Sequence, residues 1–371
     1  MLYWLATWAG EYLPALNVLK AVTFRAAFAA LFAFVLCVTL GPHFIRHLRR
    51  KKIEEDVGQK DSAFLAEKHS SKKHTPTMGG VILMGSTLLG IVCFARFDIL
   101  FTLLACFVLC TLALLGFYDD YMKLTQKRQG GHKGRNGLTV REKLVFQFTI
   151  GLGVGLILTW YGEPVLSTQL AIPFVDAAVW PVLGYFYIGW AAIVVVGASN
   201  AVNLTDGLDG LATLCTITVA VAFGLLAYFA GHAGIAEHLA VPRVHGAEEL
   251  SVVCAALAGA CLGFLWFNAH PADIFMGDTG SLPMGGLVGL VALSIKQELL
   301  LILIGGVFVV EALSVLIQIV SFRYWKRRVF LIAPLHHHFE KLGWSESKIV
   351  SRFFIVSVLL AVFSIAMLRV K

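Results

Sequence analysis

The sequence is poor in charged residues: only 14% of its 371 residues are Asp, Glu, Lys or Arg, whereas 58% are hydrophobic. The mean hydropathy is correspondingly high, at +0.78. Soluble domains carry about 25% charged residues and about half apolar ones, because their surface must face water. The composition therefore excludes an ordinary soluble enzyme and predicts a chain that faces lipid over much of its surface.

Cysteine motifs and the common catalytic signatures are also absent. The seven cysteines lie in apolar stretches without CxxC spacing, which predicts buried small side chains and excludes a zinc ribbon or a redox motif. There is no Walker A sequence, no GxSxG elbow and no HExxH pair. The net charge of +7 is typical of basic cytoplasmic loops in a membrane protein, so no nucleic-acid partner is expected.

Ten apolar runs approach the roughly 20 residues that cross a ~30 Å hydrocarbon core. They cover residues 21–44, 77–95, 99–118, 143–161, 179–199, 207–231, 250–268, 280–295, 299–322 and 350–368. The eighth run is short and contains Pro283, Gly285 and Gly286, which predicts a helix that is broken or packed inside the bundle. We therefore predict an all-α polytopic membrane protein with about ten transmembrane helices, built as a single integral membrane domain over residues 1–371.

The basic residues predict the orientation of these spans. If the first span runs inward, the inward loops hold nine Lys/Arg between residues 46 and 73, seven between 123 and 143, and six between 323 and 348. The basic residues of the outward loops are Arg96, Arg243 and Lys296. Because Lys and Arg are retained on the cytoplasmic side, both termini should be periplasmic.

Polar segments rich in Asp, Asn and His all fall at the predicted cytoplasmic ends of spans. They are HTPTMGG (74–80), FYDDYMK (117–123), NAVNLTDGLDG (200–210), FNAHPADIFMGDTGS (267–281) and PLHHHFE (334–340). We expect the loops that hold them to form one active site on the cytoplasmic face. These loops cover residues 45–76, 119–142, 200–206, 268–279 and 323–349.

Asp119 and Asp120 end the third run, where the helix macrodipole disfavours an anion by up to ~1 kcal/mol. They can be a solvated pair balanced by Lys123, or they can hold a hard cation such as Mg²⁺ or handle a proton. Because adjacent helical residues point about 100° apart, the two carboxylates should have different roles.

Three more aspartates lie on the same predicted face. Asp206 and Asp209 open the sixth run among glycines; they can cap its helix, or they can help the backbone N–H groups there to bind phosphate, ribose or metal. Asp278 precedes the eighth run and by itself would be a cap, but beside two other acidic clusters it becomes the third carboxylate of a shared site. Phe275 can stack on a base or anchor the chain at the membrane boundary.

His336, His337 and His338 are consecutive imidazoles in a basic loop. Consecutive residues cannot all ligate one metal in a regular element, so we expect hydrogen-bond donors or phosphate binders here and no zinc site. Glu311 lies inside the ninth run with Ser314 and Gln318 on the same helical face. A carboxyl group in hydrocarbon is costly, so Glu311 should face the protein interior or a wet cavity, either as a structural partner or as a functional group.

Aspartates, amides and cations at one membrane surface fit metal-assisted phosphoryl transfer at the lipid interface. The lysines on this side, Lys72, Lys73, Lys123 and Lys133, indicate a polyanionic substrate. A transporter is the alternative from another class, because it would also contain Glu311 and a discontinuous span. It would need polar residues at the membrane midplane, whereas these lie at one surface.

With these motifs in place, the chain resembles the phospho-N-acetylmuramoyl-pentapeptide-transferases, bacterial enzymes that make the first lipid-linked peptidoglycan precursor. The resemblance rests on TPTMGG, DDYMK, ASNAVNLTDGLDGL, FLWFN, FMGDTGSL and PLHHHFE, in that order across nearly the whole chain. It implies transfer of phospho-MurNAc-pentapeptide from UDP-MurNAc-pentapeptide to undecaprenyl phosphate, giving lipid I and UMP. It also implies Mg²⁺ as cofactor and a homodimer in the bacterial plasma (inner) membrane. A related transferase for another UDP-linked sugar would share the aspartates but not PLHHHFE.

The resemblance also assigns roles to individual residues. Asp119 and Asp120 match the acidic pair, one of them as base or nucleophile, and Asp278 matches the carboxylate that holds Mg²⁺, with the acidic pair as further candidate ligands. Catalytic roles extend to the histidine loop, His336, His337 and His338. Polar substrate-binding positions are matched by Lys72, Thr77, Lys123, Asn203, Asp206, Asn268 and Gln318, and the uridine pocket by Gly207, Leu208, Asp209 and Phe275.

Overall fold

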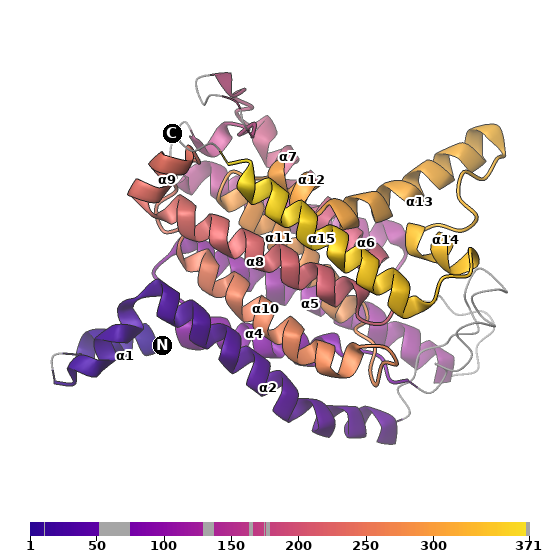
Figure 1. Ribbon diagram of the computed structural model, residues 1–371, viewed down its shortest axis with the longest axis horizontal. Helices are drawn as coiled ribbons and strands as arrows, with labels where there is room; N and C mark the ends of the chain where they lie inside the picture. The colour runs from indigo at the N-terminus through magenta and orange to yellow at the C-terminus, as the bar shows by residue number, and fades with distance from the viewer. Residues whose placement is uncertain are drawn as a thin grey trace.

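The regular structure of the described residues is almost entirely helical. The protein is represented by a computed structural model (Figure 1), which describes residues 1–10, 12–51, 75–128, 137–162, 166–173, 175 and 179–368. Among these residues there is no strand, and one isolated β-bridge joins Gln169 to Val182. The prediction of an all-α fold is confirmed for this part of the chain.

Eight described helices are long and apolar enough to cross a membrane. They are α2 (Val22–Arg50), α5 (Leu100–Arg128), α6 (Val140–Tyr161), α7 (Phe186–Thr205), α8 (Leu211–Gly231), α10 (Glu249–Asn268), α13 (Gly306–Trp325) and α15 (Glu346–Ala366). The shorter helices are α1 (Leu2–Ala9), α4 (Gly80–Phe94), α9 (Ala233–Leu239), α11 (Asp278–Ser294), α12 (Leu300–Ile304) and α14 (Leu335–Lys341), together with 3₁₀ turns at Pro14–Lys20 and Leu166–Thr168. The protein is therefore a polytopic membrane protein, and the second and eighth predicted runs form the short helices α4 and α11.

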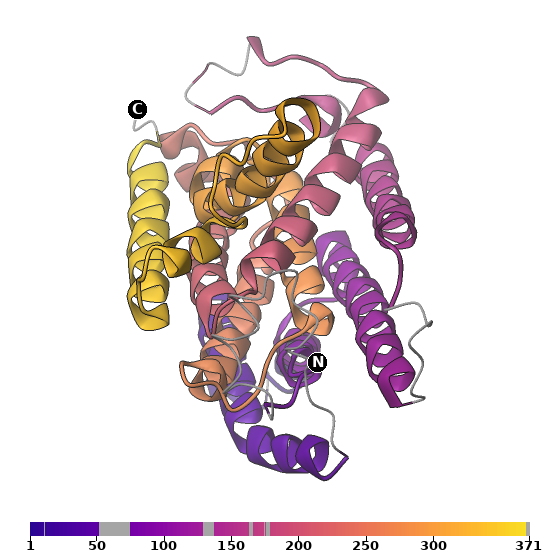
Figure 2. The same cartoon turned by 90° about the vertical axis from the view of Figure 1, so that its right-hand side faces the viewer.

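The N-terminus and the last turn of α15 lie at the same end of the bundle, on the left in Figure 1. A chain that passes through the bundle an even number of times has both of its ends on the same side. Figure 2 faces the opposite end, where α15 lies at the left edge, α2 at the bottom and α5 and α6 at the right. The polar clusters picked out in the sequence meet at this opposite end.

The eighth run forms one continuous helix at the centre of the bundle. α11 runs unbroken through Pro283, and every residue from Thr279 to Ser294 is buried. It packs against α5 and α7, so neighbouring helices surround it where lipid would otherwise reach it. Of the two possibilities for this run, packing inside the bundle is the one observed.

The ninth run is the one that breaks. Gly305 is the C-cap of α12 and the N-cap of α13, and Gly306 is the first residue of α13. Two adjacent glycines at such a point weaken helix continuity. Beyond this break α13 leans away from the other helices, at the upper right of Figure 1. One side of α13 is consequently exposed and apolar, with Leu313, Leu316 and Ile317 among its uncovered side chains.

Candidate active site

The acidic pair lies within a helix, and not at its end as the hydropathy pattern indicated. α5 continues to Arg128, well past Asp119 and Asp120. The argument from the macrodipole at a helix C-terminus was therefore wrong, because helical hydrogen bonding continues where the apolar run stops. Both carboxylates are buried, and they have different contacts, whereas the prediction that they have different roles stays a prediction.

Asp120 faces the start of α11. Its Oδ2 accepts hydrogen bonds from the backbone N–H of Thr279 at 3.0 Å and from the Thr279 hydroxyl at 2.7 Å, and its Oδ1 accepts from the N–H of Asp278 at 3.3 Å. The first N–H groups of a helix lack partners within the helix, and a carboxylate there is also favoured by the macrodipole. Asp120 therefore caps α11 from a distant point in the chain.

The same contacts decide the interpretation of Asp278. The N-cap position of α11 is Gly277, which adopts a positive φ of 75°, and Asp278 is the first residue of the helix. The Asp278 carboxylate accepts hydrogen bonds from Lys123, Lys143 and Asn203. It therefore takes part in the network described next. α11 can approach α5 this closely because Gly116 has no side chain: a Cβ there would lie 2.1 Å from the Asp278 carbonyl oxygen.

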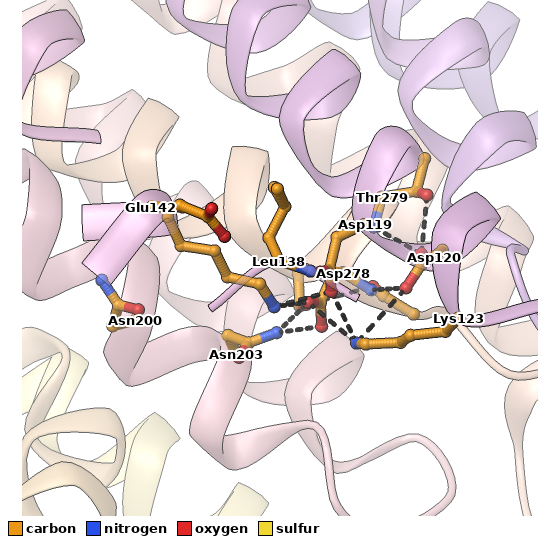
Figure 3. Close-up of polar contacts among 12 residues, drawn as sticks. Asp119, Asp120, Lys123, Leu138, Glu142, Asn200, Asn203, Asp278 and Thr279 are labelled. Atoms are coloured by element: carbon orange, nitrogen blue, oxygen red, sulfur yellow. Dashed lines mark hydrogen bonds and ion pairs between the residues drawn. The ribbon is translucent and has the colours of Figure 1, made fainter. Parts of the chain in front are cut away.

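Two lysines hold Asp119 and Asp278 together (Figure 3). The Lys143 ammonium lies 2.6 Å from Oδ2 of Asp119 and 2.6 Å from Oδ2 of Asp278. The Lys123 ammonium lies 2.7 Å from Asp119 Oδ2 and 3.3 Å from Asp278 Oδ2. On the other side, Asn203 of α7 donates to Asp278 Oδ1 at 2.8 Å. With Asp120, three carboxylates and two ammonium groups leave one net negative charge.

Ionisation of Asp278 follows from these neighbours. Asp278 precedes the eighth apolar run, and burial by itself would raise the pKa of its carboxyl. Lys123 and Lys143 outweigh burial and hold the pKa of Asp278 well below its ordinary value of 3.8. The carboxylate is therefore charged at neutral pH.

Lys143 is a site residue that the sequence motifs do not predict. Its position in the sequence predicts only a basic residue that helps to orient the chain. The local pattern was nonetheless informative, because Thr139 and Glu142 form a capping box that starts α6. The start of α6 at this point places Lys143 in its first full turn, beside the acidic pair.

A second part of the site is the loop between α7 and α8. Asp206 follows the last residue of α7 and α8 begins at Leu211, so the expectation that Asp206 and Asp209 open the sixth span was wrong. The loop is held by Asn268, whose Oδ1 accepts from the Gly210 N–H at 3.1 Å and from the Thr213 hydroxyl at 3.0 Å. The Asn268 amide also donates to the Ile274 carbonyl oxygen at 3.0 Å. Asn268 therefore ties this loop to the segment that leads into α11.

The segment before α11 is also bound to the start of α4. The Phe275 N–H donates to the Pro76 carbonyl oxygen, and the Gly79 N–H donates back to the Phe275 carbonyl oxygen, both at 2.8 Å. Thr77 lies within this pairing, next to Gly277. Leu208, in the loop between α7 and α8, is buried.

The first histidine of the loop is buried against a carboxylate. His336 is fully buried, and its ring Nδ1 lies 3.2 Å from Glu311 Oε2. The backbone N–H of His336 donates to Glu311 Oε1 at 3.1 Å. The expectation that Glu311 faces the protein interior is thus confirmed. The other ring nitrogen, Nε2, lies against Gly207: a Cβ added to Gly207 would be 2.2 Å from His336 Nε2. His336 therefore connects Glu311 to the loop between α7 and α8.

The other two histidines have different partners. The Nδ1 atom of His337 lies 2.6 Å from Glu340 Oε2, and His338 Nδ1 accepts from the Leu331 N–H at 3.1 Å. Gln318 contacts the same region, because it accepts from and donates to the backbone of residues 329–330. The structure thus places Gln318 at the loop that follows α13. Lys72, Lys73, Lys133 and most of the first loop lie outside the described residues.

The five polar clusters are linked by these contacts. Thr77 lies beside Gly277, the acidic pair contacts the start of α11, Asn203 contacts Asp278, and His336 contacts Gly207. Two groups of side chains among the described residues have the donor atoms and the proximity to hold a metal ion, with all donor atoms within 4.8 Å. They are Asp119, Asp120 and Asp278, and Asp209, His270 and Glu346.

Comparison with known proteins agrees with this arrangement. The model of glycosyl transferase family 4 matches residues 100–296, a stretch that contains all three aspartates and both lysines of the network. A phospho-N-acetylmuramoyl-pentapeptide-transferase of Desulfotalea psychrophila is 47% identical over 356 residues, 96% of each chain. The chain belongs to this transferase family. Two further members, from strains of Rhodopseudomonas palustris, are each 43% identical over 372 residues and the full length of both chains.

Membership of glycosyl transferase family 4 identifies the chain as a transferase, and confirms the resemblance found in the sequence motifs. The histidine loop and the TPTMGG segment lie outside the region that the family model matches. The relatives of this transferase nevertheless align across them, because those alignments cover nearly the whole chain.

Proposed function

We propose that this transferase moves phospho-MurNAc-pentapeptide from UDP-MurNAc-pentapeptide to undecaprenyl phosphate, giving lipid I and UMP in peptidoglycan synthesis. The observation that carries the proposal is the meeting of Asp119, Asp120 and Asp278 with two lysines in a chain whose full-length relatives bear this enzyme name. Both substrates are anions, so a site for their reaction needs cations and a means of handling charge.

The acidic group fits Mg²⁺. Its donors are all carboxylate oxygens, which hard cations prefer, and the charge balance of the cluster is negative even with both lysines present. Asp278 and Asp119 would hold the ion, because Asp120 is engaged in capping α11. When bound, Mg²⁺ supplies charge neutralisation at the phosphates of the donor.

The side chains of the chain itself then have distinct tasks. Lys123 and Lys143 are positioned to attract the phosphate groups of the two substrates. Asn203 orients Asp278 through its amide. We assign the reactive role in the acidic pair to Asp119, which either accepts the proton of the lipid phosphate or attacks the β-phosphorus of the donor. In the second route UMP leaves, and the lipid phosphate then displaces Asp119 from the phosphorus. Exchange of labelled UMP into the donor without lipid acceptor tests for the second route, since only a covalent intermediate permits it.

The nucleotide is assigned to the loop between α7 and α8 together with Phe275. Gly207, Leu208 and Asp209 form one wall in this proposal, and Phe275 offers a ring for stacking on uracil. Asp206, Thr77, Asn268, Gln318 and Lys72 keep their proposed substrate-binding roles, and His336, His337 and His338 keep their catalytic ones. The substrate-binding role of Asn268 is supported by its hydrogen bonds to Gly210, next to the first wall, and to Ile274, next to Phe275.

We further propose ten spans, periplasmic termini, a cytoplasmic active site in the bacterial inner membrane, and a homodimer. A reporter fused after residue 371 should lie outside, and one inserted near residue 129 inside. An inside C-terminus would overturn the orientation.

The deciding experiment measures UMP release by the purified protein with UDP-MurNAc-pentapeptide and undecaprenyl phosphate. Asp278→Asn should lower Mg²⁺-dependent turnover by about 10²-fold or more, the usual effect of losing a charge-stabilising group. Asp98→Asn is the matched control, because Asp98 pairs with Arg96 between α4 and α5, away from the acidic cluster, and should leave turnover unchanged. Preference of the wild type for UDP-GlcNAc, or no UMP release at all, would overturn the proposal.

A further inference from the structure

A glutamate at the start of α15 reaches into the loop between α7 and α8. Glu346 is the first residue of α15 and is 8% exposed. Its Oε1 accepts a hydrogen bond from the Asp209 N–H at 2.7 Å. Acidic residues in a first helical turn are common because they favour the macrodipole. Here, however, the carboxylate binds a backbone N–H 137 residues away in the chain, which local helix preference does not explain.

The Asp209 side chain extends this connection to a third segment. Its Oδ2 accepts from His270 Nδ1 at 3.0 Å and from the Ala272 N–H at 3.1 Å. The His270 Nδ1 atom also lies 3.3 Å from Glu346 Oε2. Asp209, His270 and Glu346, which we name the loop clamp, therefore join the loop between α7 and α8, the segment before α11 and the start of α15.

The two segments that the loop clamp joins lead to both proposed walls of the nucleotide pocket. Asp209 is in one wall, and Phe275 follows His270 by five residues in the other. The far end of the second segment is fixed independently, by the pairing of Phe275 with Pro76. Loosening the loop clamp would therefore change the separation of the walls while the remaining contacts persist.

We propose that Glu346 and His270 are positioning residues that set the spacing of the nucleotide pocket and thereby the affinity for the uridine part of the donor. This inference rests on the proposed function and names two residues that it does not use. Both residues contact Asp209, and neither belongs to the acidic cluster of Asp119, Asp278, Lys123 and Lys143. The chemistry at the acidic cluster and the binding of the lipid substrate should accordingly be separable from the loop clamp.

The experiment measures UMP affinity by calorimetry and, in turnover, KM for each substrate and kcat, on the full-length protein. Glu346→Ala and His270→Ala should each weaken UMP binding and raise donor KM by about tenfold, which is the size expected for one lost charge-assisted hydrogen bond. The KM for undecaprenyl phosphate and kcat should stay within about twofold. A merely structural role would move all four quantities together.

Conservative variants and a neighbouring control sharpen the test. Glu346→Gln keeps an oxygen for the Asp209 N–H, and His270→Asn keeps a donor near the place of Nδ1, so both should recover most of the UMP affinity. Asp273→Ala is the matched control, because it lies in the same segment but pairs on the surface with Arg49, and it should change nothing.

Three outcomes would overturn the inference: unchanged UMP affinity in both alanine variants, parallel changes in both KM values and kcat, or an equal effect of Asp273→Ala. His270 is 39% exposed in its side chain, so its variants should fold even if Glu346→Ala does not. A wild type that binds no UMP would instead refute the proposed function, which keeps the two failures distinct.

Discussion

Lys143 gives the most discriminating test of the acidic cluster, because its removal should strengthen metal binding while it slows the reaction. Lys143→Met keeps the length of the side chain and removes the charge. The ammonium lies 2.6 Å from an oxygen of Asp119 and 2.6 Å from one of Asp278. Its loss changes the charge of the cluster from one negative to two negative.

The magnitude follows from Coulomb's law. A divalent ion bound to these carboxylates would be roughly 4 Å from the ammonium, where the repulsion is about 2 kcal/mol in a water-like dielectric and larger near protein. The lower figure corresponds to about 30-fold in affinity. Lys143→Met should therefore reach half-maximal rate at a Mg²⁺ concentration at least tenfold lower than the wild type. Its maximal rate should fall by about 10²-fold, because a cation that offsets phosphate charge is missing.

The assay is the initial rate of UMP release across a Mg²⁺ titration, supported by electron paramagnetic resonance of bound Mn²⁺, which needs no turnover. Lys143→Arg keeps the charge and should leave the Mg²⁺ dependence near that of the wild type. Arg141→Met removes a nearby exposed cation from the same helix and serves as the control. Weaker or unchanged metal binding in Lys143→Met would refute the reasoning, because Lys143 would then not compete with the ion.

Three further predictions test other parts of the structure. Asp120→Ala removes the cap of α11 and should lower the thermal midpoint in detergent by an amount that corresponds to about 1–2 kcal/mol, clearly more than Asp278→Asn does; equal midpoints would remove the capping role. Gly207→Ala places a Cβ against the His336 ring and should lower kcat/KM at least tenfold in a folded protein, so near-normal kinetics would contradict the observed contact. Burial lowers the pKa of Lys296 from 10.5 to about 8, so the unfolded chain holds a proton that the folded protein releases, and the midpoint should rise from pH 8 to 10.5 in the wild type but not in Lys296→Met.

The sequence was informative about the general architecture because that information is local. The apolar runs predict the helices, and the positions of the motifs predict the end of the helix bundle at which Asp119, Asn203 and Asp278 meet. The prediction that α5 ends with its apolar run was wrong, because a helix can continue as a polar extension once it leaves lipid. Likewise, Pro283 predicted a possible break in α11, but tight packing keeps that helix continuous, and the glycine pair at Gly305 breaks the next one.

The site residues that escaped prediction are those whose significance depends on distant partners. Lys143 resembles any basic residue at the cytoplasmic end of a span, so the charge pattern explains it without a site. The cap that Asp120 supplies joins residues 158 apart, and no local motif encodes it. The bond from Glu346 to Asp209 has the same character: a glutamate in a first helical turn already has an ordinary explanation.

The assembly of the acidic cluster from distant parts of the chain has a consequence for biosynthesis. The helices that carry Asp119 and Lys143, α5 and α6, are made early, whereas Asp278 is made only after α10. Until then the charged side chains of α5 and α6 lack their contacts with Asp278, so the acidic cluster is incomplete. Under the proposed function, we therefore expect the growing chain to be inactive until at least roughly three quarters of it has been synthesised.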